Sequence, residues 1–294
     1  MIVSIIGSGV VGSIVGEGLT KLGHKIIFND IDPSRIDKMK SKGYDASLDI
    51  NYAVNNSQIS FICVPSPTDD GKINLKFITS AAESVGKVLK NKNEYHVIVV
   101  KSTVTPQTTE NVIVPAIENA SGKKAGKDFG VCMNPEFLTE IANTWTDETT
   151  LARGFFDEER IVVGEFDSRS GDVISKLYES FNKPIFRTDI KTAEFIKYAA
   201  NCALASRVSY WNEIASISQK LDIDAQKVAN IVSLDKRIGK YGSVITGKGF
   251  QGKCLPKDTE AFISFAEKHH DPVLLKAVKK VNDDIQKKLR EEDG

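Results

Sequence analysis

Short apolar runs alternate with amphipathic stretches along the first part of the chain. Runs of four to six apolar, often β-branched residues predict buried strands, and apolar positions three or four apart predict helices. The strands expected on this basis are residues 2–6, 25–28, 59–64, 96–100, 130–133, 160–164 and 184–187, with helices over 10–22, 75–89 and 108–118. Such regular alternation predicts a doubly wound, parallel Rossmann-type α/β sheet through residue 187.

The pattern changes to long helices after Thr188-Asp189, a pair suited to capping a helix. Residues 190–221 contain few helix breakers and predict one long helix, and 228–232 predict a shorter one. Over 272–289 the apolar residues form a single stripe, which predicts a helix that packs on one side. We therefore expect two domains, an α/β domain over 1–187 and an all-helical domain over 188–294. The long helix and the apolar stripe favour a homodimer through the helical domain.

Composition narrows the possible partners. The 39 Lys and Arg residues balance the 39 Asp and Glu residues, so the net charge gives no argument for a nucleic-acid polymer or an anionic membrane as partner. Apolar runs are far shorter than a bilayer span, and the chain begins on a strand, so we expect a cytoplasmic protein with no membrane contact. The four cysteines lack CxxC spacing, which predicts reduced thiols and no metal site.

A glycine-rich turn, Gly7-Ser8-Gly9-Val10-Val11-Gly12, directly follows the first predicted strand. Glycines in this pattern permit a tight turn, close approach of a pyrophosphate to the backbone, and close packing of the next helix, whose amino end faces the phosphates. The next predicted strand ends at Asn29-Asp30, and Asp30 lies 18 residues past Gly12, where an acid binds ribose hydroxyls and favours NAD over NADP. A glycine turn in an unrelated α/β protein is the alternative. Arg35 lies over the adenine or is a solvated charge.

Polar loops follow other predicted strands at the edge where open parallel sheets bind ligands. They are Pro65-Ser66-Pro67-Thr68, Lys101 to Pro106, and Asn134 to Glu140. Glu136 and Glu140 are four residues apart, so on a helix their carboxylates share one face and either serve a site or face water. The same spacing relates Lys197 and Asn201 on the long helix.

Cys254 lies between Lys253 and Lys257, just before Leu255-Pro256, where a helix can begin. Positive charge and the helix amino end favour the thiolate and hence a nucleophilic role. A small buried apolar side chain is the alternative.

Six motifs, in this order, closely resemble the UDP-glucose/GDP-mannose dehydrogenase family: GSGVVG with Asp30, CVPSPT at 63–68, KSTVTP at 101–106, NPEFLTE at 134–140, KYAAN at 197–201 and GKGFQGKCLPKD at 247–258. They cover nearly the whole chain. The resemblance implies an NAD-dependent, four-electron oxidation of a nucleotide sugar's primary alcohol to a carboxylate. UDP-glucose is the expected substrate, UDP-glucuronate the product and polysaccharide biosynthesis the expected setting.

Roles follow from the resemblance position by position. Cys254 is implied as the covalent nucleophile, which carries first a thiohemiacetal and then a thioester. Lys197 and Asn201 resemble the pair that stabilises oxyanion charge, and Asp258 resembles a residue that holds a water or assists proton transfer. Glu136 resembles the carboxylate that handles protons during thioester hydrolysis, and Thr103 a threonine near the reacting carbon.

The resemblance also implies two binding sets. NAD is expected at Gly7, Gly9, Val10, Val11, Gly12, Asp30, Arg35, Pro65, Ser66, Pro67, Thr68, Ser102, Thr103 and Glu140. The sugar nucleotide is expected at Glu136, Phe137, Leu138, Glu140, Lys197, Asn201, Arg237, Tyr241, Gly247, Gly249 and Gly252. In some family members the arginine that matches Arg237 reaches the substrate from the neighbouring subunit.

The sequence departs from the family in three respects. Gln251 replaces the first glycine of a usual pair, and Ile141 stands where glycine is common. The family continues into a third, Rossmann-like domain, whereas this chain ends on the preceding helix. We therefore expect a fragment, a naturally short form, or a chain whose substrate is held in part by another chain.

Two other functions remain open from sequence. A two-electron 3-hydroxyacid dehydrogenase of the 6-phosphogluconate or hydroxyisobutyrate kind also pairs a helical Lys with an Asn four residues later. A non-catalytic NAD-binding subunit would explain the shorter chain.

Overall fold

The computed structural model describes residues 1–69, 71–138, 154–239, 246–250 and 254–292. The chain divides into two compact units. The first contains Met1–Pro67, Asn74–Leu138 and Arg153–Lys197, and the second contains Thr68–Ile73 and Tyr198–Gly294. The long helix α7 (Ile190–Lys220) contributes residues to both. Among the described residues we find no helix with the length and apolarity that a bilayer crossing requires.

The first unit is built on an eight-stranded sheet with the order β10-β9-β8-β7-β4-β1-β2-β3. Its strands are β1 (Ile2–Ile6), β2 (Lys25–Asn29), β3 (Asp45–Ser47), β4 (Ile59–Ile62), β7 (Val97–Val100), β8 (Gly130–Met133), β9 (Ile161–Glu165) and β10 (Ile185–Asp189). The doubly wound sheet is confirmed, with one difference from the expected all-parallel arrangement. β8 and β9 pair antiparallel, with Cys132 opposite Glu165 and Met133 opposite Gly164.

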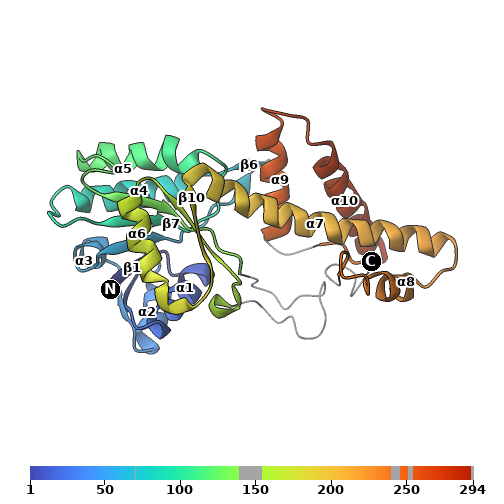
Figure 1. The fold of residues 1–294 in the computed structure, drawn as a ribbon, viewed down its shortest axis with the longest axis horizontal. Coiled ribbons are helices and arrows are strands. Elements are labelled where there is room, and N and C mark those ends of the chain that lie inside the picture. Colours follow the sequence, from blue (N-terminus) through green and yellow to red (C-terminus); the bar gives the residue numbers. More distant parts are fainter. Residues whose placement is uncertain (70, 139–153, 240–245, 251–253, 293–294) are drawn as a thin grey trace. The chain divides into compact units, whose positions relative to one another are not determined.

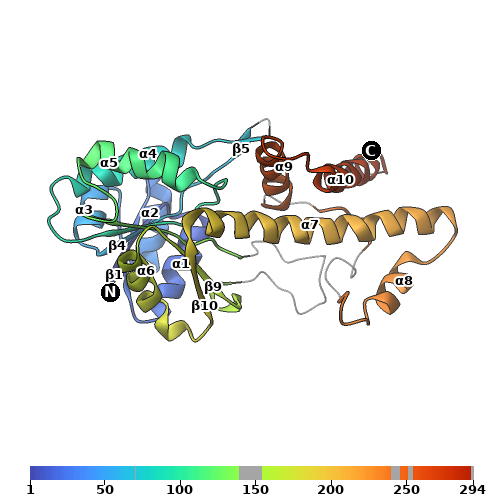
Figure 2. The same cartoon turned by 45° about the horizontal axis from the view of Figure 1, so that its top comes forward.

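Helices cover both faces of this sheet (Figures 1 and 2). α4 (Lys76–Leu89) and α5 (Val114–Ser121) lie on one face, and α1 (Val10–Lys21), α2 (Pro33–Ser41) and α6 (Ser168–Leu177) lie on the other. The central strands are buried from both sides, which is why they read as continuous apolar runs. β1, β2, β4 and β7 are mutually parallel, so the loops at their carboxyl ends follow one edge of the sheet.

Two short helices were not predicted, because no periodic apolar pattern marks them in the sequence. α2 begins at Pro33, which suits a first helical turn, and Asp32 caps it by accepting a hydrogen bond from Ser34 N. α3 (Ile50–Asn55) is capped in the same way by Asp49. Local capping therefore defines these helices more than their hydrophobic pattern does.

The second unit is helical, as expected. It contains most of α7, together with α8 (Ala225–Val232), α9 (Cys254–Ala266), α10 (Val273–Glu292) and a small hairpin of β5 (Thr68–Asp69) and β6 (Lys72–Ile73). One apolar cluster joins α7 to α9 through Tyr198, Cys202, Ala261 and Phe262. A second cluster contains Ala205 and Val208 of α7, Phe250, and Val278 of α10. The domain boundary expected after residue 187 stays a prediction.

Candidate active site

The glycine turn has the geometry that a dinucleotide site needs. A Cβ on Gly12 would lie 1.9 Å from the carbonyl oxygen of Gly7, so α1 and β1 approach too closely for any side chain there. Gly9 occupies the N-cap of α1, and the first turn carries no acidic residue. The N–H groups at the amino end of α1 therefore present a positive surface suited to a pyrophosphate.

Asp30 is fixed at the end of β2. Its Oδ2 accepts from Ser8 N at 2.6 Å and pairs with Arg35 Nη1 at 3.2 Å, and its Oδ1 accepts from Asp32 N at 3.0 Å. Arg35 is therefore an ion-pair partner and not simply a solvated charge. A carboxylate held here accepts hydrogen bonds from ribose hydroxyls and repels a ribose phosphate, so the residues present fit NAD.

The loops after β4 and β7 are joined to each other. Ser102 Oγ donates to Val64 O at 2.6 Å and to Ile62 O at 3.3 Å. Pro65, Ser66, Pro67, Ser102 and Thr103 belong to the first unit. Thr68 does not, because it begins β5 in the second unit, where its Oγ1 donates to Lys257 O at 3.5 Å.

Glu136 and Lys197 form a buried ion pair in the first unit. Lys197 Nζ donates to Glu136 Oε1 at 2.9 Å and to Glu136 O at 2.7 Å, and both residues are less than a tenth exposed. Leu138 N donates to Glu136 Oε2 at 2.6 Å. Burial raises the pKa of Glu136, but the charge and hydrogen bond of Lys197 outweigh it and hold that pKa below its ordinary value. Glu136 is therefore a carboxylate at neutral pH.

Lys101 and Glu158 support the same loop, and the sequence assigned neither of them a role. Lys101 Nζ donates to Asn134 Oδ1 at 2.9 Å and to Pro135 O at 3.3 Å, and Glu158 Oε1 accepts from Phe137 N at 3.3 Å. Burial lowers the pKa of Lys101, and the negative charges of Glu158 and Glu136 partly oppose this shift. Burial raises the pKa of Glu158. A lysine directly after the wholly apolar run of β7 was the signal that could have revealed this charge.

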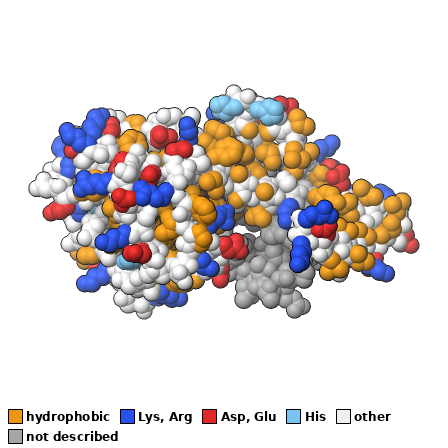
Figure 3. All heavy atoms as spheres, in the orientation of Figure 1, with side chains coloured by type: hydrophobic (Ala, Val, Ile, Leu, Met, Phe, Trp, Pro, Cys, Tyr) orange, Lys and Arg blue, Asp and Glu red, His pale blue; other side chains and the backbone are white. Residues whose placement is uncertain are grey.

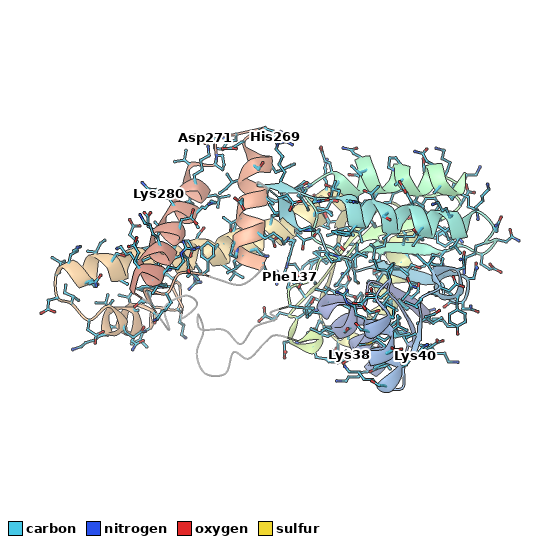
Figure 4. The ribbon with its side chains drawn as sticks, turned by 180° about the vertical axis from the view of Figure 1, so that it is seen from behind. Lys38, Lys40, Phe137, His269, Asp271 and Lys280 are labelled. Atoms are coloured by element: carbon cyan, nitrogen blue, oxygen red, sulfur yellow. The ribbon has the colours of Figure 1, made fainter. Side chains whose placement is uncertain are left out.

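The Phe137 ring has two cations near it. The Arg160 guanidinium is 4.1 Å from the ring centroid, and Lys197 Nζ is 5.6 Å from it. Figure 4 labels Phe137, which lies on the loop after β8. Cation–π attraction thus holds the ring that follows Glu136 in sequence.

A second buried cluster lies in the helical unit. Asn201 Nδ2 donates to Asp258 Oδ2 at 2.6 Å, and Lys257 Nζ pairs with Asp258 Oδ1 at 2.6 Å. Asn201 is 7% exposed and Asp258 is 1% exposed. The predicted Asn201 and Asp258 are therefore brought together by α7 and α9.

Cys254 differs from the other three cysteines, all of which lie in described parts of the chain. Cys63, Cys132 and Cys202 are buried, and burial raises the pKa of each thiol to about 12. Cys254 is exposed and is the first residue of α9. Lys257, which was expected to favour the thiolate, forms an ion pair with Asp258, and Lys253 lies outside the described residues.

The predicted sugar loop is described in part. Gly247 and Gly249 are described, whereas Glu140, Tyr241 and Gly252 lie outside the described residues, as do Ile141 and Gln251. Arg237 is exposed and its guanidinium pairs with Asp235 at 2.6 Å.

Glu194 is a further buried acid that sequence reasoning missed. From α7 it accepts hydrogen bonds from Gln107 N at 2.6 Å and Thr109 N at 2.8 Å, four and six residues after the predicted Thr103. Burial raises its pKa to about 7. This carboxylate caps the helical turn that follows the Thr103 loop.

Comparison with known families agrees with this geometry. Residues 38–182 match the NAD binding domain of the UDP-glucose/GDP-mannose dehydrogenase family, and residues 191–284 match its central domain. Residues 2–73, which contain the glycine turn, also match the family described as NADP oxidoreductase coenzyme F420-dependent.

Individual relatives support the same assignment. A GDP-mannose 6-dehydrogenase from Pseudomonas syringae pv. tomato is 37% identical over 89% of this chain and 63% of its own length. A UDP-glucose 6-dehydrogenase from Haloferax volcanii is 36% identical over 96% of this chain and 70% of its own. The structure of a UDP-glucose dehydrogenase from Pyrobaculum islandicum superposes with a TM-score of 0.85 at 32% identity, over 96% of this chain and 68% of that one. The chain thus spans under two thirds of the Pseudomonas relative, and it belongs to the UDP-glucose/GDP-mannose dehydrogenase family.

Proposed function

We propose that this protein oxidises the primary alcohol of a nucleotide sugar to a carboxylate in two successive two-electron steps, with NAD as oxidant. The observation that carries the proposal is the exposure of Cys254 at the first turn of α9, while the other three cysteines are buried. Cys254 lies four residues before Asp258, the buried partner of Asn201. A reactive sulfur is what separates four-electron oxidation from ordinary alcohol oxidation.

The chemistry requires a group that retains the aldehyde. Bound NAD would supply the hydride acceptor for both oxidations, that of the alcohol and, after the spent cofactor is exchanged, that of the sulfur adduct. Cys254 Sγ adds to the aldehyde carbon and gives a thiohemiacetal, which becomes a thioester when it loses hydride and its hydroxyl proton. Water then attacks the thioester carbon, the carbon–sulfur bond breaks, and the thiolate and the sugar carboxylate separate.

Charge develops on an oxygen in each of these steps, and Lys197 and Asn201 are the groups we assign to it. The buried Lys197 ammonium supplies positive charge. An amide has two N–H donors, so Asn201 can hold Asp258 with one and direct the other at an oxyanion. Thr103, from the loop after β7, is assigned to the region of the reacting carbon.

Thioester hydrolysis also needs a base that takes a proton from water. Glu136 suits this role because Lys197 keeps it ionised, and each of its oxygens retains lone pairs beyond the hydrogen bonds described above. Asp258, held by Asn201 and Lys257, is assigned to the water or to proton transfer beside Cys254.

We assign the remaining predicted residues to binding. Gly7, Gly9, Val10, Val11 and Gly12 surround the amino end of α1 for the pyrophosphate, and Asp30 binds the ribose. Gly247 and Gly249 are assigned to the sugar, and the exposed Arg237 to the substrate of the same or a neighbouring subunit.

A homodimer through the helical unit is part of the proposal. Exposed apolar side chains occur along α7 and on and after α8, and apolar atoms are prominent over this part of the chain in Figure 3. They are Tyr210, Ile217, Leu221, Ile231 and Leu234. Contiguous exposed apolar surface marks interaction sites. Light scattering of the purified chain tests the homodimer, and a monomer would contradict it.

Cytoplasmic location and a role in polysaccharide biosynthesis stay predictions.

The stoichiometry of turnover tests the activity. We expect two NADH for each sugar consumed, with UDP-glucose preferred over GDP-mannose, and Cys254→Ser should stall before the acid is released. One NADH per sugar from the unaltered protein would reject the four-electron reaction. A preference for GDP-mannose would retain the reaction and change the substrate.

A two-electron 3-hydroxyacid dehydrogenase is the second candidate, because the Lys197 and Asn201 spacing on α7 also suits it. It predicts one NADH per small hydroxy acid and full activity in Cys254→Ala. NAD binding without turnover of either substrate class would favour a non-catalytic subunit.

A further inference from the structure

Three side-chain amides hold the backbone of the loop that precedes Cys254. Gly249 N donates to Asn212 Oδ1 at 3.1 Å, and Phe250 N donates to Asn282 Oδ1 at 2.6 Å. Gln286 Nε2 donates to Lys248 O at 3.0 Å. We call Asn212, Asn282 and Gln286 the amide clamp. Three consecutive loop residues are thus each fixed by a different side chain.

The clamp comes from two helices that are far apart in sequence. Asn212 lies on α7, whereas Asn282 and Gln286 lie on α10, and Ser209 Oγ joins these helices by donating to Val278 O at 2.9 Å. Asn212 is 1% exposed and Asn282 is 5% exposed. Burying an amide oxygen costs free energy unless it is hydrogen-bonded, and here the loop N–H groups supply those bonds. Among the described residues, the buried Asn212 Nδ2 has no hydrogen-bond partner.

The fit between the clamp and the loop is close. Gly249 has φ of +64°, a conformation that strongly favours glycine. A Cβ at this position would lie 2.5 Å from Gln286 Nε2 and 2.8 Å from Asn282 Oδ1. The backbone therefore passes directly against two of the three amides.

The same loop shares an apolar anchor with the start of α9. The Phe250 ring is 2% exposed and packs with Ala205, Val208 and Val278, and Leu255 packs against this cluster. Leu255 directly follows Cys254. Movement of the loop at Phe250 would therefore disturb the first turn of α9, where the sulfur is located.

We propose that Asn212, Asn282 and Gln286 are positioning residues for Cys254. The clamp fixes the backbone at 248–250, and the apolar cluster that contains Phe250 and contacts Leu255 transmits this order to the residue beside the sulfur. All of these residues belong to the helical unit. The catalytic part of the inference rests on the proposed function, whereas its structural part, an ordered loop and an ordered Cys254, does not.

Isosteric substitutions separate the hydrogen bonds from packing. Asn282→Leu keeps the approximate volume and removes the acceptor, whereas Asn282→Asp keeps an acceptor for Phe250 N. Gln286→Met removes the donor to Lys248 at a partly exposed position, so it tests the clamp if Asn282→Leu does not fold. Lys280, which is labelled in Figure 4, is exposed on α10, so Lys280→Met is the matched control.

Two measurements need no turnover. We expect amide hydrogen exchange at Phe250 to become about 10-fold faster in Asn282→Leu, since the hydrogen bond from Phe250 N to Asn282 Oδ1 is lost. Alkylation of Cys254 by iodoacetamide should become slower in Asn282→Leu and Gln286→Met, and Asn282→Asp and Lys280→Met should match the unaltered protein. Unchanged exchange and alkylation in folded Asn282→Leu and Gln286→Met would overturn the proposal, whatever the substrate proves to be.

Kinetics then distinguish positioning from a general structural role. With an active protein, kcat should fall about 10- to 100-fold in Asn282→Leu, the usual consequence of a small misplacement of a reacting group. The KM for NAD should stay unchanged, because the dinucleotide turn belongs to the other unit. A rise in the KM for NAD with unchanged kcat would overturn it.

Discussion

Asn201 Nδ2 donates to Asp258 Oδ2 at 2.6 Å, and both side chains are buried in the helical unit. The bond joins a residue in the middle of α7 to one in the second turn of α9. Because Lys257 takes the other oxygen of Asp258, the carboxylate has a donor on each side. A neutral donor on α7 is therefore a requirement of this pair.

Asn201→Asp replaces that donor with a second carboxylate. Two acids at hydrogen-bond distance cannot both ionise without mutual repulsion, so the variant should lose about 1–3 kcal/mol of stability at pH 8 and regain part of it as the pH falls. Thermal unfolding at pH 5 and pH 8 measures the change. Asn230→Asp on the exposed face of α8 serves as the control. Equal losses of stability at both pH values would contradict repulsion between the two carboxylates.

Lys101→Met should raise the pKa of Glu136. Lys101 is one of the positive charges that favour the Glu136 carboxylate, and methionine fills similar space without charge. A carbon-13 NMR titration of the Glu136 carboxyl measures this directly, and Lys127→Met on the surface is the matched control. An unchanged pKa of Glu136 would contradict this prediction and would leave Lys101 the role of holding Asn134 and Pro135 by hydrogen bonds.

Glu194 should make stability fall as the pH rises. Its pKa is raised from 4.5 to about 7, so its stabilising contribution is fully present below pH 4.5 and is lost as the pH rises through about 7. The free energy of unfolding should decrease by up to about 3 kcal/mol over this window, and Glu194→Gln should remove that slope. Denaturant unfolding at several pH values, with Glu83→Gln as control, provides the test. A slope that persists in Glu194→Gln would assign it to other groups.

Cys254 should be the cysteine that iodoacetamide modifies in the native protein. Cys63, Cys132 and Cys202 are protected because burial both blocks the reagent and raises the pKa of each thiol to about 12. Peptide mass spectrometry of native and denatured protein counts the modified sites, and Cys254→Ser is the control. Rapid native labelling of Cys202 would contradict the structure of the helical unit.

Much of the fold was predictable because buried parallel strands and a long helix leave direct marks in sequence. The sequence predicted strands at 2–6 and 96–100, the glycine turn and a helix over 190–221, and the structure has β1 at Ile2–Ile6, β7 at Val97–Val100 and α7 at Ile190–Lys220. The two-residue strands β5 and β6 were not, since a pair of residues has no periodicity. The antiparallel pairing of β8 with β9 was also missed, because an apolar run does not encode its direction.

The candidate site was predictable where chemistry depends on motifs and was missed where it depends on burial. Glycines, Cys254 and the Lys197 and Asn201 spacing could be read directly. Glu158 and Asn282 could not, because charged and amide side chains are normally exposed and these two are buried only through tertiary partners. Their partners lie tens of residues away, beyond any local pattern.

Because β9 runs antiparallel to β8, the segment that precedes β9 places its side chains at the same edge of the sheet as the loop that follows β8. In an all-parallel sheet, residues that precede a strand lie on the opposite border from those that follow its neighbour. Here Glu158 and Arg160 precede β9 and still meet Phe137, which follows β8. Changes in the segment entering β9 can therefore alter the surroundings of Glu136 without any change in the loops that parallel strands provide.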